Sequence, residues 1–395
     1  TNLSSEEAER EIKLENEFFV VEVDKLTGLV SRIFDKNNRK EVLQDGGNRV
    51  QIYEDYPVSG RTSIIFPIDA AIFDAWELYI YQQPGGVRYV ELKDPVEVKL
   101  AEKGPVRGRV LVKYKYAQEG RPDTMFVQEI MLYHKVPQVN FKLHVDWHSE
   151  HRLAKVAFPL NVQSDFTTYE APYGFVTRRN PISPNATLAE RAKYEVPGQK
   201  WIDHTGEDGR YGVSLLNDCK YGFDNANNLI RMTLFRSART PDELRAHFGL
   251  TVDKETELTD QGEHQVDYAL YPHSSDSREA LTARKAYEFN YPLIPLIERT
   301  HEGDLPKVHS FISAQPENII LTVIKKAEDS DDIILRFYET SGKDTRAVIR
   351  VAESFKGATE NDLMESETSE IPIEEGAIEV PISKYEIKTL KIIQA

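Results

Sequence analysis

The sequence predicts an all-β protein whose antiparallel strands pack into sandwiches, and three observations support this fold class. Residues 139–147 alternate apolar and polar side chains, as a strand with one buried face does, and residues 110–116 repeat the pattern. Helical signals are few and short. Turn-forming residues separate the alternating runs at 25–28, 83–86, 120–123, 207–209 and 341–343. Many short strands with polar outer faces build sandwiches rather than a βαβ core.

Helices are expected in three places only. Two serines stand before the charged run 6–10, so residues 1–14 are expected to form a short helical lead-in. Residues 240–243 combine a capping Thr, a Pro in the first turn and two acidic side chains near the positive end of the helix dipole. Residues 277–288 place side chains at helical spacing. None of these segments is long enough to change the predicted fold class.

The length and charge of the chain exclude several classes of partner. A chain of 395 residues and 45.2 kDa suggests two or three domains. The formal charge is 49 − 65 = −16, which repels phosphate backbones and anionic lipid. No run approaches the roughly 20 apolar residues of a membrane span, and polar residues 1–14 do not resemble a signal peptide. We therefore expect neither a nucleic acid nor a membrane as partner.

A domain boundary is predicted between 291 and 306, where Pro and Gly residues cluster without a sustained period. The expected division is a lead-in at 1–14, a large β domain at 15–300 and a small β sandwich at 301–395. The small domain has enough strand-like runs for a sandwich of its own. Within it, the acidic stretch 354–370 is expected to be a loop.

Cys219 is the only cysteine, so no intramolecular disulfide and no zinc site of several thiolates can form. A reducing compartment, the cytoplasm, is the simplest interpretation. The thiol could be a nucleophile, but its neighbours predict a strand that runs into a turn. Free cysteines in such places are mostly small buried or half-buried fillers.

Three imidazoles and a carboxylate fall within eight residues, at His144, Asp146, His148 and His151. A metal site is one hypothesis. On an extended strand, however, His144 and His148 lie roughly 13 Å apart, because each residue advances about 3.3 Å. A metal holds its nitrogen ligands at about 2.0–2.1 Å, so these two histidines could hardly share one ion. A solvated polar strand face is therefore the favoured interpretation, with no metal expected in this chain.

No local sequence motif indicates a complete active site. Glycoside hydrolysis needs two carboxyl groups that face each other across a cleft, but with 65 acidic residues the spacing alone cannot select a pair. The sequence contains no phosphate-binding Gly-rich loop, no Gly-x-Ser-x-Gly and no His-Glu-x-x-His. Three segments do mix aromatic rings with polar groups, as sugar-binding surfaces do, at 73–77, 173–180 and 199–204. Core aromatics with polar flanks are the favoured interpretation of each, and a sugar-binding surface is the alternative.

At these segments the chain resembles the carboxy-terminal β half of glycoside hydrolase family 38, the α-mannosidases. The resemblance rests on many short matches in order, among them Asp74-Ala75-Trp76-Glu77, Tyr271-Pro272-His273 and Leu234-Phe235-Arg236-Ser237. Further matches follow the chain from residue 15 to its end, at 15–19, 33–36, 53–55, 145–148, 155–159, 173–178, 194–197, 200–203, 211–222, 262–264, 325–329 and 335–342. Each match is weak alone, but their order and extent are specific.

The resemblance implies a galactose-mutarotase-like β-supersandwich followed by a small β-sandwich. It also implies an enzyme that hydrolyses α-linked mannose with retention, through a covalent glycosyl intermediate. In the family, the aspartate nucleophile, the acid/base and the ligands of a zinc-like divalent metal belong to an amino-terminal barrel. No catalytic residue and no metal ligand can be carried over to this chain, and His144 and Asp146 lie in a matched β segment.

The chain is therefore interpreted as a non-catalytic carboxy-terminal part of an α-mannosidase that braces the barrel domain of the same protein. Tyr173, Arg178 and Arg179 are the residues expected to close one side of the sugar pocket around an α-mannoside or oligosaccharide. Two alternatives remain open, a free-standing carbohydrate-binding module and an aldose-epimerase-like enzyme on the supersandwich. A homo-oligomer is compatible with each of them.

Overall fold

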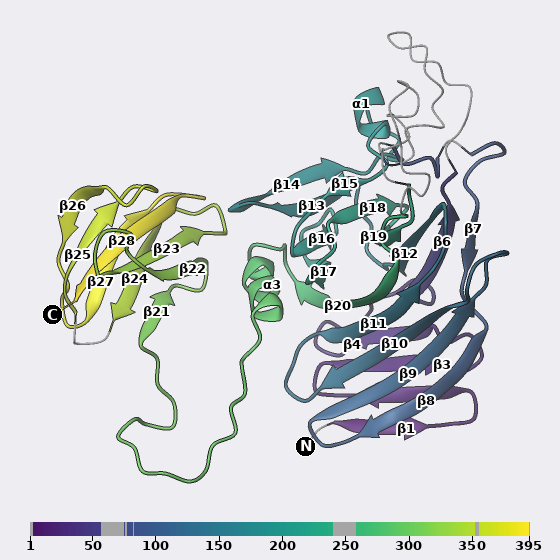
Figure 1. Cartoon of the computed structure of the whole chain (residues 1–395), viewed down its shortest axis with the longest axis horizontal. Coiled ribbons are helices and arrows are strands. Elements are labelled where there is room, and N and C mark those ends of the chain that lie inside the picture. Colours follow the sequence, from purple (N-terminus) through teal and green to yellow (C-terminus); the bar gives the residue numbers. More distant parts are fainter. Residues whose placement is uncertain are drawn as a thin grey trace, which may run out of the picture. The chain divides into compact units, whose positions relative to one another are not determined.

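The computed structural model describes residues 3–56, 75, 77–81, 83–239, 258–351 and 355–394. It divides into two compact units, 1–169 with 177–275 and 170–176 with 276–395. Antiparallel strands make up almost all of the regular structure (Figure 1), so the predicted all-β class is confirmed. The division falls after Ser275 rather than at residue 300, and the helix at 282–290 belongs with the smaller unit.

The chain begins with a strand and not with the expected helix. Ser4–Glu7 (β1) pairs antiparallel with Glu11–Glu15 (β2), from Ser4 opposite Glu15 to Glu7 opposite Ile12. The helical signals of this segment are local, whereas β2 offers a complete ladder of backbone partners. The sheet continues through β3 (Phe19–Asp24), β4 (Val30–Asp35) and β5 (Lys40–Glu41). The lead-in is thus the edge of a five-stranded sheet.

Two larger sheets complete the first part of the chain. A nine-stranded sheet has the order β14 (Gly174–Arg179), β13 (Phe166–Ala171), β16 (Trp201–Thr205), β17 (Tyr211–Asn217), β20 (Gly262–Ser274), β11 (Val139–Trp147), β10 (Thr124–Tyr133), β9 (Arg107–Tyr116) and β8 (Pro95–Lys103). A six-stranded sheet has the order β15 (Val196–Pro197), β18 (Gly222–Ala226), β19 (Leu229–Arg236), β12 (Arg152–Pro159), β6 (Arg49–Glu54) and β7 (Tyr89–Glu91). A short helix, α1 (Leu188–Arg191), lies between β14 and β15 in the chain.

The core of the larger unit is built from the apolar faces of these strands. The alternating residues of β11 are buried as predicted, while Asp146 on its other face is exposed. Phe141 of β11 stacks on Tyr268 of β20 at 5.2 Å between ring centroids and meets Phe158 of β12 at 5.3 Å. Rings from both large sheets therefore share one core, as in a β sandwich.

The smaller unit contains α3 (Thr282–Asn290) and two sheets. One sheet is ordered β21 (Ile312–Gln315), β24 (Thr345–Val351) and β27 (Ala377–Ile382), and the other β22 (Ile319–Lys326), β23 (Ile333–Glu339), β28 (Ile387–Gln394), β25 (Phe355–Asn361) and β26 (Glu367–Ile371). Their buried side chains form a separate core around Leu335, Ile349 and Leu390. Arg284 of α3 donates from Nε to the Glu317 carbonyl at 2.8 Å and from Nη2 to the Ile319 carbonyl at 2.9 Å.

The other sequence predictions have mixed outcomes. The expected helix at 277–288 begins later, as α3, and residues 240–243 lie outside the described residues. The acidic stretch 354–370 is not simply a loop, because β25 and β26 occupy much of it. Thr359 opposes Glu370 in that hairpin, so acidic side chains lie on an edge strand that faces solvent. Charge therefore marks an edge strand here, and not an absence of structure.

Candidate functional site

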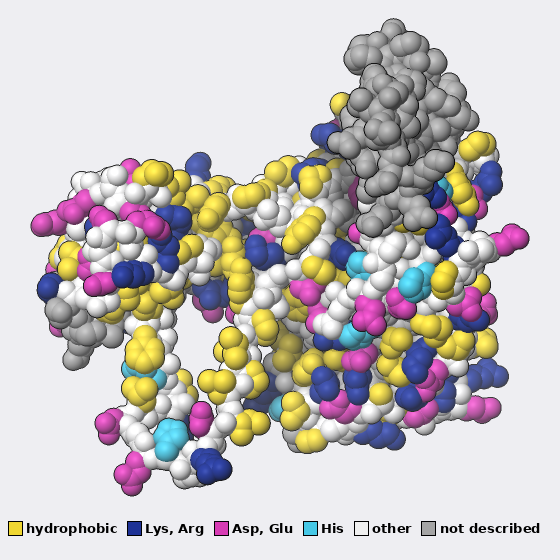
Figure 2. Space-filling view, viewed as in Figure 1, with side chains coloured by type: hydrophobic (Ala, Val, Ile, Leu, Met, Phe, Trp, Pro, Cys, Tyr) yellow, Lys and Arg dark blue, Asp and Glu magenta, His cyan; other side chains and the backbone are white. Residues whose placement is uncertain are grey.

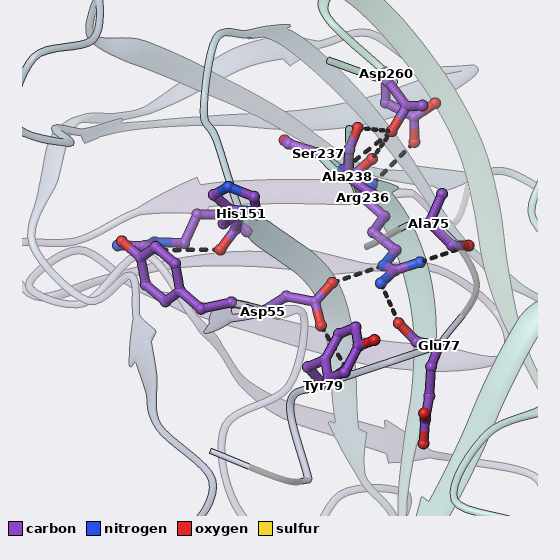
Figure 3. Close-up of polar contacts among 12 residues, drawn as sticks. Asp55, Ala75, Glu77, Tyr79, His151, Arg236, Ser237, Ala238 and Asp260 are labelled. Atoms are coloured by element: carbon purple, nitrogen blue, oxygen red, sulfur yellow. Dashed lines mark hydrogen bonds and ion pairs between the residues drawn. The ribbon is translucent and has the colours of Figure 1, made fainter. Parts of the chain in front are cut away.

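Asp55 and Arg236 form an enclosed ion pair at the ends of inner strands of the six-stranded sheet (Figure 3). Arg236 ends β19 and Asp55 follows β6, and β12 lies between those strands. The Arg236 Nε lies 2.6 Å from Asp55 Oδ2, and the Asp55 side chain is only 1% exposed. The other Asp55 oxygen accepts from the Tyr79 amide at 2.7 Å, and the guanidinium also donates to the carbonyls of Ala75 and Glu77. The pair thus fastens the 75–79 segment to the sheet.

The backbone around this pair is held by a ladder that continues beyond the strand ends. The Asp55 amide donates to the His151 carbonyl at 3.0 Å, and the His151 amide donates to the Ser237 carbonyl at 2.9 Å. Asp260 accepts from the Arg236 amide at 2.9 Å through Oδ2 (Figure 3). Since three neighbouring strands fix the two backbones, the side chains of Asp55 and Arg236 approach each other in one geometry.

Aromatic and aliphatic side chains cover the outer face of the same sheet beside the pair. Tyr53 of β6 and Leu153 of β12 are buried together with Ile80. Tyr81 stacks on Tyr194 at 4.4 Å between centroids, and burial is the main cause that raises the pKa of Tyr81 to about 12. The apolar cover removes water from the polar groups that lie beneath it.

Lys155 lies at the centre of a second, deeper ion cluster. Its neighbour Val156 faces the sandwich core, so Lys155 projects from the opposite face of β12, where its side chain is only 1% exposed. Its Nζ lies 2.6 Å from Asp224 Oδ2 and also contacts Glu195, and the other oxygen of Asp224 pairs with Arg231. Burial alone lowers the pKa of Lys155, but the two carboxylates outweigh it, so the pKa is raised and the ammonium stays charged.

The two ion clusters are suited to holding strands together. In each of them the carboxylates already accept hydrogen bonds from cations, and in the second cluster two positive groups balance two negative ones. A glycosidase needs one carboxylic acid that donates a proton and one carboxylate that faces the sugar. Neither cluster has that arrangement.

A Ser, a His and an Asp also meet in the nine-stranded sheet, although sequence reasoning did not identify them. His273 Nε2 lies 2.7 Å from Asp203 Oδ2 and 3.1 Å from Ser214 Oγ, and all three side chains are buried. A nucleophilic triad places the acid and the serine on different ring nitrogens, whereas here both meet the same nitrogen. Ser214 also donates directly to Asp203 at 2.8 Å. The group is therefore a structural polar network.

His204 lies in another buried network, on β16. Its Nε2 faces the Val162 carbonyl at 3.2 Å and Asn228 Oδ1 at 3.0 Å, so this nitrogen carries the proton, while Nδ1 lies 3.0 Å from Asn225 Nδ2. Burial is the largest cause that lowers the pKa of His204 below 6.5. The ring is therefore neutral in the folded protein near neutral pH.

The stability of the protein is expected to fall as the pH drops below 6.5, because the unfolded chain then binds a proton at His204 that the folded chain resists. The contribution of neutral His204 to the free energy of unfolding is fully present above pH 6.5. Below pH 6.5 it decreases by up to about 1.4 kcal/mol per pH unit. Urea unfolding between pH 5.5 and 7.5 measures this slope. His204→Gln should flatten it, whereas His301→Gln, at an exposed position, should not. An unchanged slope in His204→Gln would contradict the assignment.

The residues predicted for the sugar pocket do not form one cluster within either unit. Tyr173 belongs to the smaller unit, is 39% exposed and meets the ring of Tyr338 edge-on at 5.3 Å. Arg178 and Arg179 belong to the larger unit. The Arg178 guanidinium lies over the Tyr169 ring at 4.8 Å, and Arg179 lies 3.2 Å from Asp165 Oδ2. Both arginines thus have protein partners of their own.

His148, His151 and Cys219 each contact neighbouring groups of the protein. His148 Nε2 pairs with Asp146 Oδ2 at 2.9 Å, and His151 packs against the Tyr56 ring. Among the described residues no group of three His, Cys, Asp or Glu side chains is placed to hold a metal ion. Cys219 is half-buried, and burial is the main cause that raises the pKa of its thiol to about 12. The thiol is therefore a poor nucleophile at neutral pH.

Of the three aromatic segments, 199–204 follows the favoured interpretation of core aromatics with polar flanks. Trp201 lies on β16 and is only 2% exposed, so it belongs to the interior. Most of 73–77 falls outside the described residues. In the described parts of the chain, no helix has the length and apolar character that a membrane crossing requires.

The described strands form a β-supersandwich and a small β-sandwich, each with a core of its own. The family model "Glycosyl hydrolases family 38 C-terminal domain" matches residues 14–244, and "Glycosyl hydrolases family 38 C-terminal beta sandwich domain" matches residues 318–390. The chain therefore belongs to glycosyl hydrolase family 38 and carries its C-terminal region. The resemblance seen in the sequence and the fold class are both confirmed.

Relatives of known name support the same assignment. The chain is 28% identical over 410 residues to "Alpha-mannosidase G" of Dictyostelium discoideum. This alignment covers 100% of this chain and 33% of the relative. It is 26% identical over 400 residues to "Alpha-mannosidase 2C1" of Mus musculus, covering 98% of this chain and 34% of the relative. The solved structure of an α-mannosidase from Enterococcus faecalis has the same fold, with a TM-score of 0.74 at 17% identity, over 96% of this chain and 42% of that one. The chain spans about a third of the length of these curated relatives.

Proposed function

We propose that this chain is the structural β portion of a retaining α-mannosidase and supplies none of its catalytic residues. The observation that carries the proposal is the ordered match of two family 38 C-terminal domains to a chain that spans a third of its α-mannosidase relatives. On this proposal the substrate is an α-mannoside or oligosaccharide, and the nucleophile, the acid/base and a divalent metal belong to an amino-terminal barrel. A reducing compartment, the cytoplasm, suits the single cysteine.

The ion clusters support a bracing role. Asp55, Glu195 and Asp224 are engaged by cations, and these ion pairs tie together β6, β12, β18 and β19. A sheet fixed in this way offers a rigid surface against which a catalytic domain can be positioned. Bracing and carbohydrate contact are separate parts of the proposal and are tested separately.

The first test is hydrolysis of a chromogenic α-mannoside. The 395-residue chain alone is expected to give no turnover above the uncatalysed rate. The same chain joined to an amino-terminal barrel of the family 38 type is expected to hydrolyse the substrate with retention. Metal-dependent turnover by the 395 residues alone would overturn the proposal and favour a free-standing enzyme on the supersandwich.

The second test addresses the proposed wall of the sugar pocket. The longer enzyme is this chain joined to its amino-terminal barrel. In it we expect kcat/KM to fall by about tenfold in each of the variants Tyr173→Ala, Arg178→Ala and Arg179→Ala. Thr177→Ala, at an exposed position on the same strand, is the matched control and should leave kcat/KM unchanged. Thermal unfolding identifies any loss caused by the Arg179–Asp165 pair. Unchanged kcat/KM in all three variants would remove these residues from the pocket.

A further inference from the structure

A segment between α3 and β21 exposes apolar side chains to an unusual degree. Residues 291–311 contain no helix or strand. Leu293 is 97% exposed, Leu296 83% and Ile297 100%, and Tyr291 and Ile294 are also largely exposed. Figure 2 shows hydrophobic side chains standing out along this segment. Soluble proteins rarely leave so continuous an apolar run in water unless another surface covers it.

Residues 291–297, called the apolar strap from this point on, are apolar on every side. Pro292 and Pro295 fix their own φ angles and favour an extended polyproline II path with three residues per turn. That period aligns Tyr291, Ile294 and Ile297 along one edge, two leucines along the second and the two prolines along the third. No polar edge is left for solvent, so the strap is suited to lie between surfaces rather than on top of one.

The strap has definite limits. At its start, Tyr291 stacks on Tyr287 of α3 at 5.8 Å, and both rings line a groove of about 480 Å³. After Ile297 the sequence becomes charged and exposed, with Glu298, Arg299 and Asp304. The strap is therefore the continuous apolar part of the segment, whereas the exposed Leu305, Val308 and Phe311 further along stand among polar and charged residues.

We propose that the apolar strap docks into an apolar groove on the amino-terminal catalytic region of the same polypeptide, an inference that rests on the proposed function. The family 38 matches at 14–244 and 318–390 flank the strap on both sides. Two solved Enterococcus faecalis structures with this fold extend well beyond the part that this chain covers, which is 43% and 42% of their lengths. A region tethered in the same polypeptide has a high effective concentration at the strap, which favours it over a second copy.

Thiol labelling tests the docking. Ile297→Cys is made in a Cys219→Ser background, and its rate of reaction with a soluble maleimide is compared in the 395-residue chain and in the longer protein. Labelling is expected to be at least about tenfold slower in the longer protein, as for any site that must open before it reacts. Met364→Cys is the matched control, because Met364 is 83% exposed but lies between β25 and β26. Its rate should differ by less than about twofold between the two proteins.

Three results would overturn the inference. Equal labelling of the Ile297→Cys variant in both proteins would show that the catalytic region does not cover the strap. Slow labelling in the 395-residue chain that depends on protein concentration would identify a second copy as the occupant. Slow labelling of that chain without concentration dependence would show that another part of the same 395 residues covers the strap.

The α-mannoside assay on the same samples separates this inference from the proposed function. Turnover by the longer protein without protection of the introduced thiol contradicts the docking alone. Protection of the introduced thiol without turnover supports the docking and contradicts the proposed function.

Discussion

Replacing Lys155 by Met is expected to lower the free energy of unfolding by about 3–5 kcal/mol. Methionine fills much of the space of the lysine stem but leaves Glu195 and Asp224 without the ammonium that they share. The Asp224 side chain is only 3% exposed, so water cannot replace the lost partner. All three tryptophans precede residue 276, so tryptophan fluorescence during urea unfolding reports on the larger part of the chain.

Two controls separate the loss of charge pairing from the loss of a lysine as such. Lys99→Met removes a 50% exposed partner of Glu97 and should cost less than about 1 kcal/mol. Adding Glu195→Gln to Lys155→Met should restore part of the lost stability, because it removes one of the unpaired charges. A loss of less than about 1 kcal/mol in Lys155→Met would show that the buried cluster does not stabilise the sheet.

Replacing Arg236 by Met is expected to cost about 3 kcal/mol, because the enclosed Asp55 carboxyl then loses the guanidinium that it pairs with. The substitution also removes the donors that hold the carbonyls of Ala75 and Glu77. We therefore expect faster proteolysis within 75–79 at a denaturant concentration that leaves the sheets folded. Urea unfolding and limited proteolysis measure the two effects.

The control for this prediction lies close by. Arg88→Met removes a 56% exposed arginine whose guanidinium is 3.5 Å from Glu54, so its cost should be below about 1 kcal/mol. Arg236→Lys keeps the positive charge but loses the planar guanidinium. Compared with Arg236→Met, it should regain part of the free energy of unfolding but less of the resistance to proteolysis within 75–79. Equal stability of Arg236→Met and the parent protein would show that the Asp55 pair does not fasten this segment.

The fold class was predictable because the alternation of apolar and polar residues in a strand is a local property of the sequence. The alternation in 139–147 needs no knowledge of the neighbours to identify the buried face, and the structure buries those residues. The prediction of a helix in residues 1–14 was wrong because the structure of this segment depends on a neighbouring strand. Charged residues after two serines are equally compatible with a helix and with a solvent-facing edge strand, and the choice was made by pairing with β2.

The ion clusters could not be predicted from the sequence, because their members are distant in the chain. Asp55 and Arg236 are 181 residues apart, and Lys155 and Asp224 are 69 residues apart. Only the strand order β18, β19, β12 and β6 brings them together. A lysine within the apolar run Leu153–Pro159 was the one available signal, since a charge there needs a buried partner.

The proposed pocket residues illustrate the same limit. The mixture of rings and guanidinium groups at 173–179 was suggestive, but the sequence could not show that Arg178 would lie over Tyr169 or Arg179 beside Asp165. The family motifs identified the fold and showed that the chain corresponds to the C-terminal region of family 38 proteins. They gave no catalytic group, and the contacts of each side chain depended on tertiary structure.

The most direct measurement is to trap the covalent intermediate of the longer enzyme with a fluorinated mannosyl fluoride and to map the labelled peptide by mass spectrometry. A retaining glycosidase forms a glycosyl ester on one carboxylate, and the fluorinated sugar slows its hydrolysis. We predict that the label lies outside these 395 residues and that every peptide of the β portion is unmodified. A mannosyl ester on any Asp or Glu of this chain would contradict the account.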